Sequence, residues 1–345
     1  MRCAATGPTI PAPISPTATI RKCGGGTTTV SEKQHMTHIM RLIRAALVAA
    51  SGLGLAAPAV ADVLTVQPVT DDVWAIVGPT QQRNPQNLAN NATFGLVVTP
   101  EGAVLMDPGG SWQGAAALHA AVRTVTDQPV AYVINTGGQD HRWLGNGYWQ
   151  ARGATVIASA AAVADHHARA QDHMIALSHF LGEGIDGTEP AFADVTFEND
   201  HTLDFGGLTF DIMHRGAAHT PGDSFVWLDE RNVMFTGDIV YVDRLLGNGP
   251  ARDTDSWIAV FDAMAAYEPA HIVPGHGSAT DLATARRDTY DYLVNLRREV
   301  GALIDAGGSI IDAPGIDQSA WAYLAQFEAL AGRNAQAAYE EMEWE

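Results

Sequence analysis

Four strand-like runs of this chain end in tight turns that carry a histidine or an aspartate. These turns read TGGQDH, GAAHTPGDS, MFTGD and VPGHG, and they hold Asp140, His141, His219, Asp238 and His276. Each run stops at glycine or proline, the residues that most often end regular structure. Loops at strand ends along one sheet edge are where binding and catalytic groups gather. We therefore expect a fold that brings several strand ends, and these side chains, to one edge.

Imidazole nitrogens and carboxylate oxygens from separate loops form a donor set that suits zinc, with iron or manganese as alternatives. The adjacent pair Asp140 and His141 fits such a site. The three residues before it are Gly137, Gly138 and Gln139, and none of them is an imidazole. The residues alone leave open a full metal site, a reduced one or a remnant.

Strand-like and helix-like segments alternate from about residue 62 onward. Residues 94–109 read as two strands joined by a turn, whereas 160–182 and 283–306 have apolar residues spaced three and four apart, as in helices. A β-rich stretch followed by helices occurs twice, which predicts two sheets packed face to face with helices outside. Because no linker or repeat divides the chain, we expect one domain over residues 62–345 that ends in helices.

The first 61 residues do not share this pattern. Residues 1–35 are rich in Pro, Thr, Gly and Ala, and we interpret them as a non-native or disordered extension. Residues 36–61 combine a positive region, an apolar stretch and a small-x-small site, the pattern of a secretory signal peptide. The apolar stretch is too short to span a membrane, although an anchor helix is the alternative. We expect cleavage after Ala61 and a periplasmic or secreted mature protein.

Charge and cysteine usage narrow the range of functions. The chain has a formal net charge of −19, and every basic residue after Lys33 is an arginine. Such a surface repels nucleic acids and anionic membranes, so a small-molecule substrate is the expected partner. Both cysteines, Cys3 and Cys23, precede the expected cleavage site. The mature chain then has no disulfide, no thiolate ligand and no thiol nucleophile.

Five segments resemble, in order, the conserved segments of the metallo-β-lactamase superfamily. They are LMDPG, NTGGQDHRWLGN, HTPGDS, FTGD and VPGHG, and the resemblance spans about residues 73–277. Each motif alone is weak, but all five in this order are specific. The resemblance implies an α+β fold, the αββα four-layer sandwich. It also implies a metal site at the shared edge of the two sheets and a metal-dependent hydrolase activity.

The resemblance further implies a set of ligands. The family's first metal site uses two histidines of an H-x-H-x-D-H stretch and the histidine of the HTPG-like turn. Its second site uses the Asp and His that end that stretch and the histidine of the PGHG-like turn, and the TGD aspartate bridges both. By this correspondence, Asp140, His141 and His276 belong to the second site. His219 is the remaining first-site ligand, and Asp238 is the bridge.

The first site lacks two of its three histidine ligands. Counting back from Asp140, the two H-x-H positions fall on Thr136 and Gly138, and neither is an imidazole. We therefore expect one zinc ion per chain rather than two, with iron or manganese as alternatives. The glycines are expected to leave room for substrate where the missing ligands would be.

The expected chemistry is hydrolysis by a metal-activated water, with Asp238 or His219 orienting the water or moving its proton. The bond attacked is an ester, thioester or amide-type bond, including a β-lactam. Asp238 argues mildly against a dedicated lactamase, because true lactamases carry Cys or Ser there. Two alternatives stay open: a mononuclear-iron oxygenase of sulfur compounds, and a non-catalytic periplasmic binding or accessory protein.

Several other side chains have weaker expectations. Asp107 is expected to hydrogen-bond a ligand loop. Arg142 is expected either to bind an anionic substrate group or to form a surface salt bridge, and His214 to replace a missing ligand or to have no role in the site. The polar segment 79–95 is either a substrate-contacting loop or an ordinary surface loop. A solvated face of helix 160–182 is expected to carry His166, His167, His173 and His179.

Overall fold

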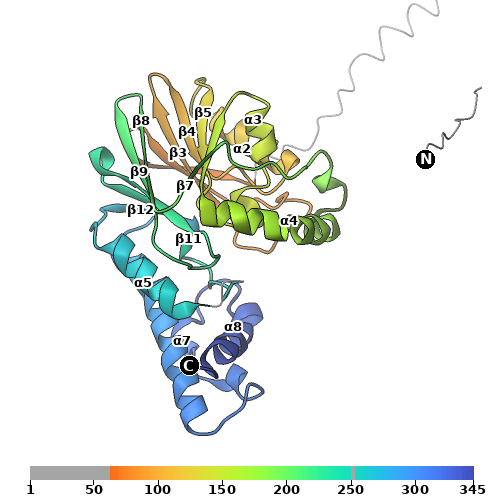
Figure 1. Ribbon diagram of the computed structural model, residues 1–345, viewed down its shortest axis with the longest axis vertical. Coiled ribbons are helices and arrows are strands. Elements are labelled where there is room, and N and C mark those ends of the chain that lie inside the picture. Colours follow the sequence, from red (N-terminus) through yellow and green to blue (C-terminus); the bar gives the residue numbers. More distant parts are fainter. Residues whose placement is uncertain (1–62, 250–252) are drawn as a thin grey trace, which may run out of the picture. The chain divides into compact units, whose positions relative to one another are not determined.

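The computed structural model describes residues 63–249 and 253–345 (Figure 1). The extension predicted for residues 1–35, the signal peptide predicted for 36–61 and its cleavage site lie outside the described residues. No helix in the described ranges is long and apolar enough to cross a membrane.

Two sheets form the centre of the fold. The first has the order β1-β2-β3-β4-β5-β6-β7, antiparallel as far as β4 and parallel from there on. The second has the order β12-β11-β10-β9-β8, and only its β11–β12 pair is parallel. The first sheet contains β1 Thr65–Thr70, β2 Val73–Val77, β3 Thr93–Thr99, β4 Gly102–Met106, β5 Val130–Ile134, β6 Thr155–Ser159 and β7 Val195–Phe197. The second contains β8 Asp200–Phe205, β9 Leu208–His214, β10 Ser224–Leu228, β11 Val233–Tyr241 and β12 His271–His276.

Helices lie on the outer sides of the two sheets (Figure 1). The α-helices are α2 Trp112–Val122, α3 Asn146–Gln150, α4 Ala160–Leu181, α5 Thr254–Ala265, α6 Leu282–Ala285, α7 Asp291–Asp305 and α8 Phe327–Met342. Shorter turns are η2 Asp140–Arg142, η3 Gly182–Ile185, η4 Asp229–Arg231, the π-helical η5 Arg286–Tyr290, η6 Ala313–Gly315 and η7 Ser319–Trp321. Local signals set two of the starts, because the hydroxyls of Ser111 and Ser159 cap the N-termini of α2 and α4.

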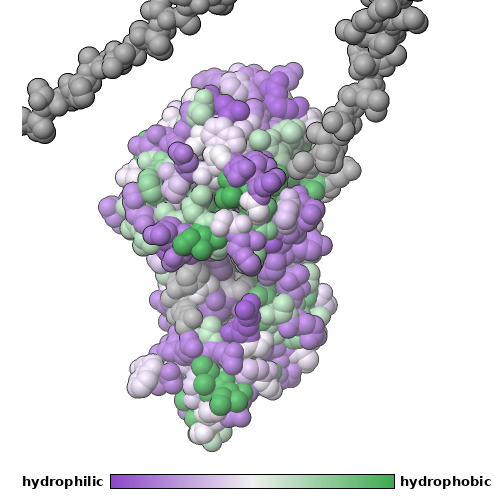
Figure 2. Space-filling model, turned by 90° about the vertical axis from the view of Figure 1, so that its right-hand side faces the viewer, coloured by the Kyte–Doolittle hydropathy of each residue, from purple (hydrophilic) through white to green (hydrophobic). Residues whose placement is uncertain are grey.

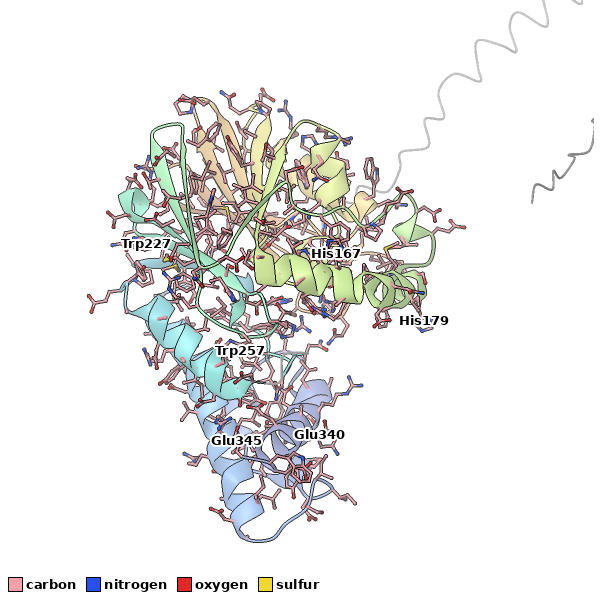
Figure 3. All side chains as sticks on the ribbon, in the orientation of Figure 1. His167, His179, Trp227, Trp257, Glu340 and Glu345 are labelled. Carbon is pink, nitrogen blue, oxygen red and sulfur yellow. The ribbon has the colours of Figure 1, made fainter. Side chains whose placement is uncertain are left out.

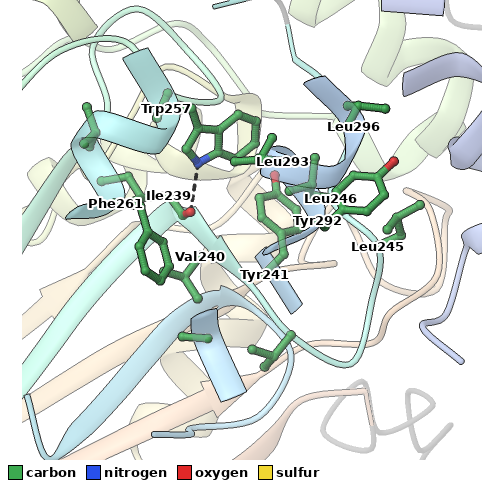
Figure 4. Packing of buried hydrophobic residues seen from close by; sticks show 14 of the residues in the cluster. Ile239, Val240, Tyr241, Leu245, Leu246, Trp257, Phe261, Tyr292, Leu293 and Leu296 are labelled. Carbon is green, nitrogen blue, oxygen red and sulfur yellow. Dashed lines mark hydrogen bonds between the residues drawn. The ribbon is translucent and has the colours of Figure 1, made fainter. Parts of the chain in front are cut away.

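The core is layered as this arrangement requires. Between the sheets, Val97, Phe210 and Phe235 belong to one buried cluster contributed by both. On the outer side of the second sheet, α5, α7 and α8 share a cluster with β11, where the indole of Trp257 donates to the carbonyl oxygen of Ile239 at 2.9 Å (Figure 4). A third cluster joins α2 and α3 to the first sheet. The predicted αββα four-layer sandwich is confirmed.

The surface agrees with the charged composition. The face seen in Figure 2 is largely hydrophilic, with small separate apolar patches. Large apolar side chains that are exposed are scattered, for example Ile175 and Ile311. Scattered apolar groups of this kind are ordinary for a globular protein.

Candidate functional site

His141, Asp238 and His276 converge at one edge of the two sheets. His141 lies in η2, just after β5, whereas the other two lie in β11 and at the end of β12. Their ligand atoms lie within 4.8 Å of one another, and all three residues are buried. Nε2 of His141 is 3.2 Å from Oδ2 of Asp238, and Nε2 of His276 is 3.2 Å from Oδ1. Two imidazoles and a carboxylate converging on one point fit a single zinc-type ion.

The local backbone of β11 helps to place the aspartate. Gly237 has a φ of +49°, and a Cβ at this position would overlap the hydroxyl of Thr136. The pairing of β11 with β12 also shifts register between Phe235 and Gly237. Such irregularities redirect the side chain that follows them. The glycine of the FTGD turn is therefore required by backbone geometry, and Asp238 comes directly after it.

A buried arginine forms an ion pair with Asp238. Arg142 is fully buried, and its Nη2 lies 2.7 Å from Oδ1 of Asp238 and 2.7 Å from the carbonyl oxygen of Gly275. Burial alone raises the pKa of Asp238, but Arg142 and the neighbouring His141 outweigh it and hold that pKa well below its usual range. The carboxylate is therefore charged, as a metal ligand must be. Neither role expected for Arg142 is correct, because its guanidinium is enclosed by protein and reaches neither substrate nor solvent.

Asp107 completes this buried network. Its Oδ1 accepts from the backbone N–H of Thr136 at 2.7 Å, and its Oδ2 accepts from Nη1 of Arg142 at 2.7 Å. Both donors belong to the segment that carries His141. The prediction that Asp107 hydrogen-bonds a ligand loop is confirmed, and the interaction fixes that loop against the end of β4.

Asp140 is not a member of the three-residue cluster formed by the described residues. Its carboxylate forms a two-point ion pair with Arg83, in which Nε and Nη2 of the guanidinium donate to the two carboxylate oxygens. Burial raises the pKa of Asp140, but Arg83 and His141 outweigh burial and lower it well below its usual range. Oδ1 of Asp140 lies 3.2 Å from Nδ1 of His141, and Nη2 of Arg83 lies 3.2 Å from the same nitrogen. A carboxylate in this position can accept the second N–H of a metal-bound histidine. The predicted role of Asp140 as a metal ligand stays a prediction.

His219 also stands apart from the cluster. Its Nδ1 lies 3.1 Å from the carbonyl oxygen of Gly247, and its ring lines a cavity that His141 and His276 also line. Burial lowers the pKa of His219 to about 4, so the ring is neutral at neutral pH. His214 bonds instead to the carbonyl oxygen of Asp223 through Nδ1 at 2.8 Å, and it does not line the cavity. The metal-binding roles assigned from sequence stay predictions, and the geometry favours His141, Asp238 and His276.

The space beside the glycines is filled by protein. If His141 takes the place expected of Asp140, the two H-x-H positions fall on residues 137 and 139 instead. A Cβ on Gly137 would overlap Oδ1 of Asp223, and one on Gly138 would overlap Oδ2 of Asp165. The expectation that the glycines leave room for substrate is therefore wrong. They leave room for carboxyl groups from two neighbouring segments, and the first half-site is closed.

A cavity of about 540 Å³ lies over the cluster. Arg83 and Gln139 line one part of it, Arg244 lies beside the end of β11, and Leu330 with Arg333 forms a wall from α8. The polar segment 79–95 does contribute to this cavity, through Gln82 as well as Arg83. No sequence motif marked Arg244 or Arg333. Arg333 lies on α8, which reaches the cavity only through the tertiary fold.

The histidines of α4 divide into two pairs. His167 and His179 are exposed, as expected (Figure 3). His166 and His173 are buried, which contradicts the expectation of a solvated face. The ring of His166 stacks on Trp143 with centroids 4.5 Å apart, and Nδ1 of His173 accepts from the indole N–H at 3.3 Å. These two histidines pack the back of the loop that carries His141.

Known proteins share this architecture. Among solved structures, a metallo-beta-lactamase from Pontibacter korlensis aligns with a TM-score of 0.54 at 22% identity, covering 67% of this chain and 99% of that one. The stereoselective inverting sec-alkylsulfatase Pisa1 from Pseudomonas sp. aligns with a TM-score of 0.63 at 15% identity, covering 81% of this chain and 50% of that one. At these identities the likeness shows the fold alone.

Sequence comparison is more specific. The curated metallo-beta-lactamase type 2 of Bacteroides fragilis is 27% identical over 85 residues, which is 24% of this chain and 34% of that protein. The match thus covers about a third of the relative's length. The family model of the metallo-beta-lactamase superfamily matches residues 89–276, more than half of the chain. This match shows that the chain belongs to the metallo-beta-lactamase superfamily.

Proposed function

We propose that this protein is a hydrolase that works with one metal ion, zinc in the first instance, held by His141, Asp238 and His276. The observation that carries the proposal is the convergence of these three buried side chains within 4.8 Å. Family membership supports a metal-dependent hydrolase type of function. The bond attacked is an ester, thioester, sulfate ester or amide-type bond. A signal-peptide pattern over residues 36–61 supports a periplasmic or secreted location.

The donor set fits one ion on its own chemistry. His141 presents Nε2 to the cluster, while Asp140 lies at its Nδ1, the arrangement seen where a carboxylate orients a metal-bound imidazole. Arg142 keeps Asp238 charged and immobile. When bound, such an ion lowers the pKa of a coordinated water to about 7 and polarises a carbonyl or ester oxygen.

The remaining residues prepare the cavity for proton transfer and exclude solvent. The carbonyl oxygen of Gly247 accepts from Nδ1–H of His219, so Nε2 of the neutral ring is unprotonated. His219 can therefore accept a proton at Nε2 within the cavity, as a weak base with a pKa of about 4. Tyr241 stacks on His276 with ring centroids 4.5 Å apart and fixes that ring.

Metal analysis of purified protein tests the assignment. We expect about one zinc per chain in the wild type and a loss of bound zinc in His276→Ala. Asp140→Asn should keep the site but weaken zinc affinity by roughly 10–100-fold, because it neutralises the carboxylate that lies beside His141 and pairs with Arg83. His214→Ala is the matched control, because this histidine does not line the cavity, and its zinc content should equal that of the wild type.

Activity is tested on the same proteins with esters, thioesters, sulfate esters and β-lactams. Hydrolysis by the zinc-loaded wild type should disappear with a chelator and in His276→Ala. Zinc retained in full by His276→Ala would refute the ligand assignment, and two zinc ions per chain would refute the single site. A zinc-loaded wild type that hydrolyses none of these substrates would instead favour the non-catalytic binding protein.

A further inference from the structure

The cavity wall is strongly cationic although the chain is strongly acidic. Arg83, Arg244 and Arg333 line the cavity, and its described lining includes no Asp or Glu. The charge of Arg83 is matched by Asp140. The other two differ from most described arginines, which lie within 4.0 Å of a carboxylate. Among the described residues, Arg244 and Arg333 have no such partner, an arrangement shared only by the distant Arg152.

Arg244 is the more unusual of the two. It is only 6% exposed, and its Nε has no hydrogen-bond partner. Its one side-chain hydrogen bond among the described residues joins Nη1 to Nδ1 of His276 at 3.2 Å. A buried guanidinium without a carboxylate is costly, because the charge has lost water and gained no partner.

The contact with His276 also depends on the state of the metal site. A guanidinium can only donate, so in this contact Nδ1 of His276 accepts and Nε2 carries the ring proton. A metal held at Nε2 of His276 would require the proton of the neutral ring to sit on Nδ1. Nδ1 would then not accept from Arg244, and the guanidinium would be free to bind an anion in the cavity.

Arg333 adds a second cation from a different part of the chain. It lies on α8, beyond the matched family region of residues 89–276. The neighbouring Ala329 and Leu330 of the same helix give the cavity an apolar wall, and Phe180 of α4 adds another apolar side chain. The cavity therefore presents two unpaired guanidinium groups together with apolar surface. Its volume suits a small molecule.

We propose that Arg244 and Arg333 form an anion-binding subsite, and that the substrate is an organic monoanion with a carboxylate or sulfate group and a short apolar part. A carboxylate and a sulfate both offer paired oxygens that a guanidinium binds in two-point fashion. The identification of this ligand as a substrate rests on the proposed hydrolase function. The binding of the anion does not.

Calorimetric titration of the zinc-loaded protein with hexanoate and with hexyl sulfate tests the subsite directly, with 1-hexanol as the neutral probe. We expect at least one anion to bind and hexanol to bind far more weakly. Arg244→Gln should weaken anion affinity about tenfold, and the exposed Arg333→Gln about threefold. Arg298→Gln is the matched control, because this arginine is exposed on α7 and pairs with Glu299 outside the cavity. Its anion affinity should match that of the wild type.

The outcomes separate clearly. Binding of hexanoate alone or of hexyl sulfate alone identifies the anionic group. Absence of binding by either anion, equal binding of hexanol, or unchanged affinity in both cavity variants would overturn the subsite. Circular dichroism checks that Arg244→Gln is folded. If it is not, Arg333→Gln decides the question, because an exposed side chain can be replaced without disturbing the core.

A matched pair of substrates distinguishes this inference from the hydrolase proposal. Mono-4-nitrophenyl glutarate carries a carboxylate, whereas 4-nitrophenyl butyrate is a neutral ester of similar size. We expect a higher kcat/KM for the anionic ester, and a rise in its KM in Arg244→Gln and Arg333→Gln. Arginine-dependent anion binding without hydrolysis of either ester, or of the thioesters, sulfate esters and β-lactams tested above, would refute the hydrolase and keep the subsite. Hydrolysis without charge preference, unchanged in both variants, would keep the hydrolase and refute the subsite.

Discussion

Replacement of Arg142 by methionine tests how much the buried ion pairs of Arg142 with Asp107 and Asp238 stabilise the fold. The guanidinium is enclosed between two buried carboxylates, with Nη1 2.7 Å from Asp107 and Nη2 2.7 Å from Asp238. It also donates to the carbonyl oxygens of Thr93 and Gly275. Arg142→Met keeps most of the side-chain volume but removes the charge and every donor. Both carboxylates then stay buried without a cation.

The expected loss follows from the cost of keeping those carboxyl groups in the fold. Breaking a buried ion pair by removing one partner costs about 3–5 kcal/mol. Protonation limits the cost, since a carboxyl forced to stay neutral at pH 7 costs about 4 kcal/mol relative to an unfolded pKa of about 3.9. The same limit is about 1.5 kcal/mol at pH 5. Because burial already raises the pKa of Asp107 despite Arg142, the variant should lose stability as pH rises above about 4.

Urea unfolding at pH 7 and pH 5 measures this loss. With a denaturant slope of about 3 kcal/mol per M, a loss of 4 kcal/mol lowers the midpoint by about 1.3 M at pH 7. The difference from wild type should shrink at pH 5. Adding Asp107→Asn to Arg142→Met should recover part of the loss, since one carboxylate is then neutral. Arg298→Gln, on the surface, should stay within about 0.5 kcal/mol. A variant within 1 kcal/mol of wild type at pH 7, or a deficit that grows at pH 5, would refute the reasoning.

Two further measurements probe the packing around the site. Gly137→Ala should lower the free energy of unfolding, measured in urea, by about 1–3 kcal/mol, because the added methyl displaces the carboxyl of Asp223. Gly315→Ala is the control, because its methyl meets open space, and it should be nearly neutral. Equal effects of the two substitutions would contradict the filled space beside Gly137. The pKa of buried His166 is lowered to about 4, so its neutral form stabilises the fold. That stability is fully present above about pH 6.5 and is lost towards pH 4, by about 3 kcal/mol. His166→Phe should flatten this acid limb in urea unfolding, and an unchanged limb would contradict the assignment.

The sequence supported the architecture and the general position of the site. Alternating apolar runs and turns predicted two sheets with helices outside, because each pattern depends on neighbours close in the chain. The turns with His141, Asp238 and His276 predicted a shared edge for the same reason: each turn ends its own strand. These features are local, and the tertiary fold only brings them together.

The different positions of Asp140 and His141 depend on a residue far away in the chain. The family resemblance assigned both adjacent residues to the same metal site. In the fold, Arg83, 57 residues earlier, pairs with Asp140 and leaves His141 to face Asp238. The glycines misled in the same way, because the filling of their space depends on the distant Asp223. Long-range partners decide such cases, and no local pattern identifies them.

The arrangement of charge at this edge links the missing half-site to the cavity. Asp223 fills the space beside Gly137, and its pKa is raised to about 8 by burial and by the nearby Asp238, so that it is mostly uncharged at neutral pH. Positive charge near the site comes from arginines that line the cavity, namely Arg83, Arg244 and Arg333. Guanidinium groups bind and orient anions, but their high pKa prevents them from activating water as a metal does. Under the two proposals, the arginines would bind the charge of the substrate and the metal site would activate water, so a substrate without an anionic group would use only the metal site.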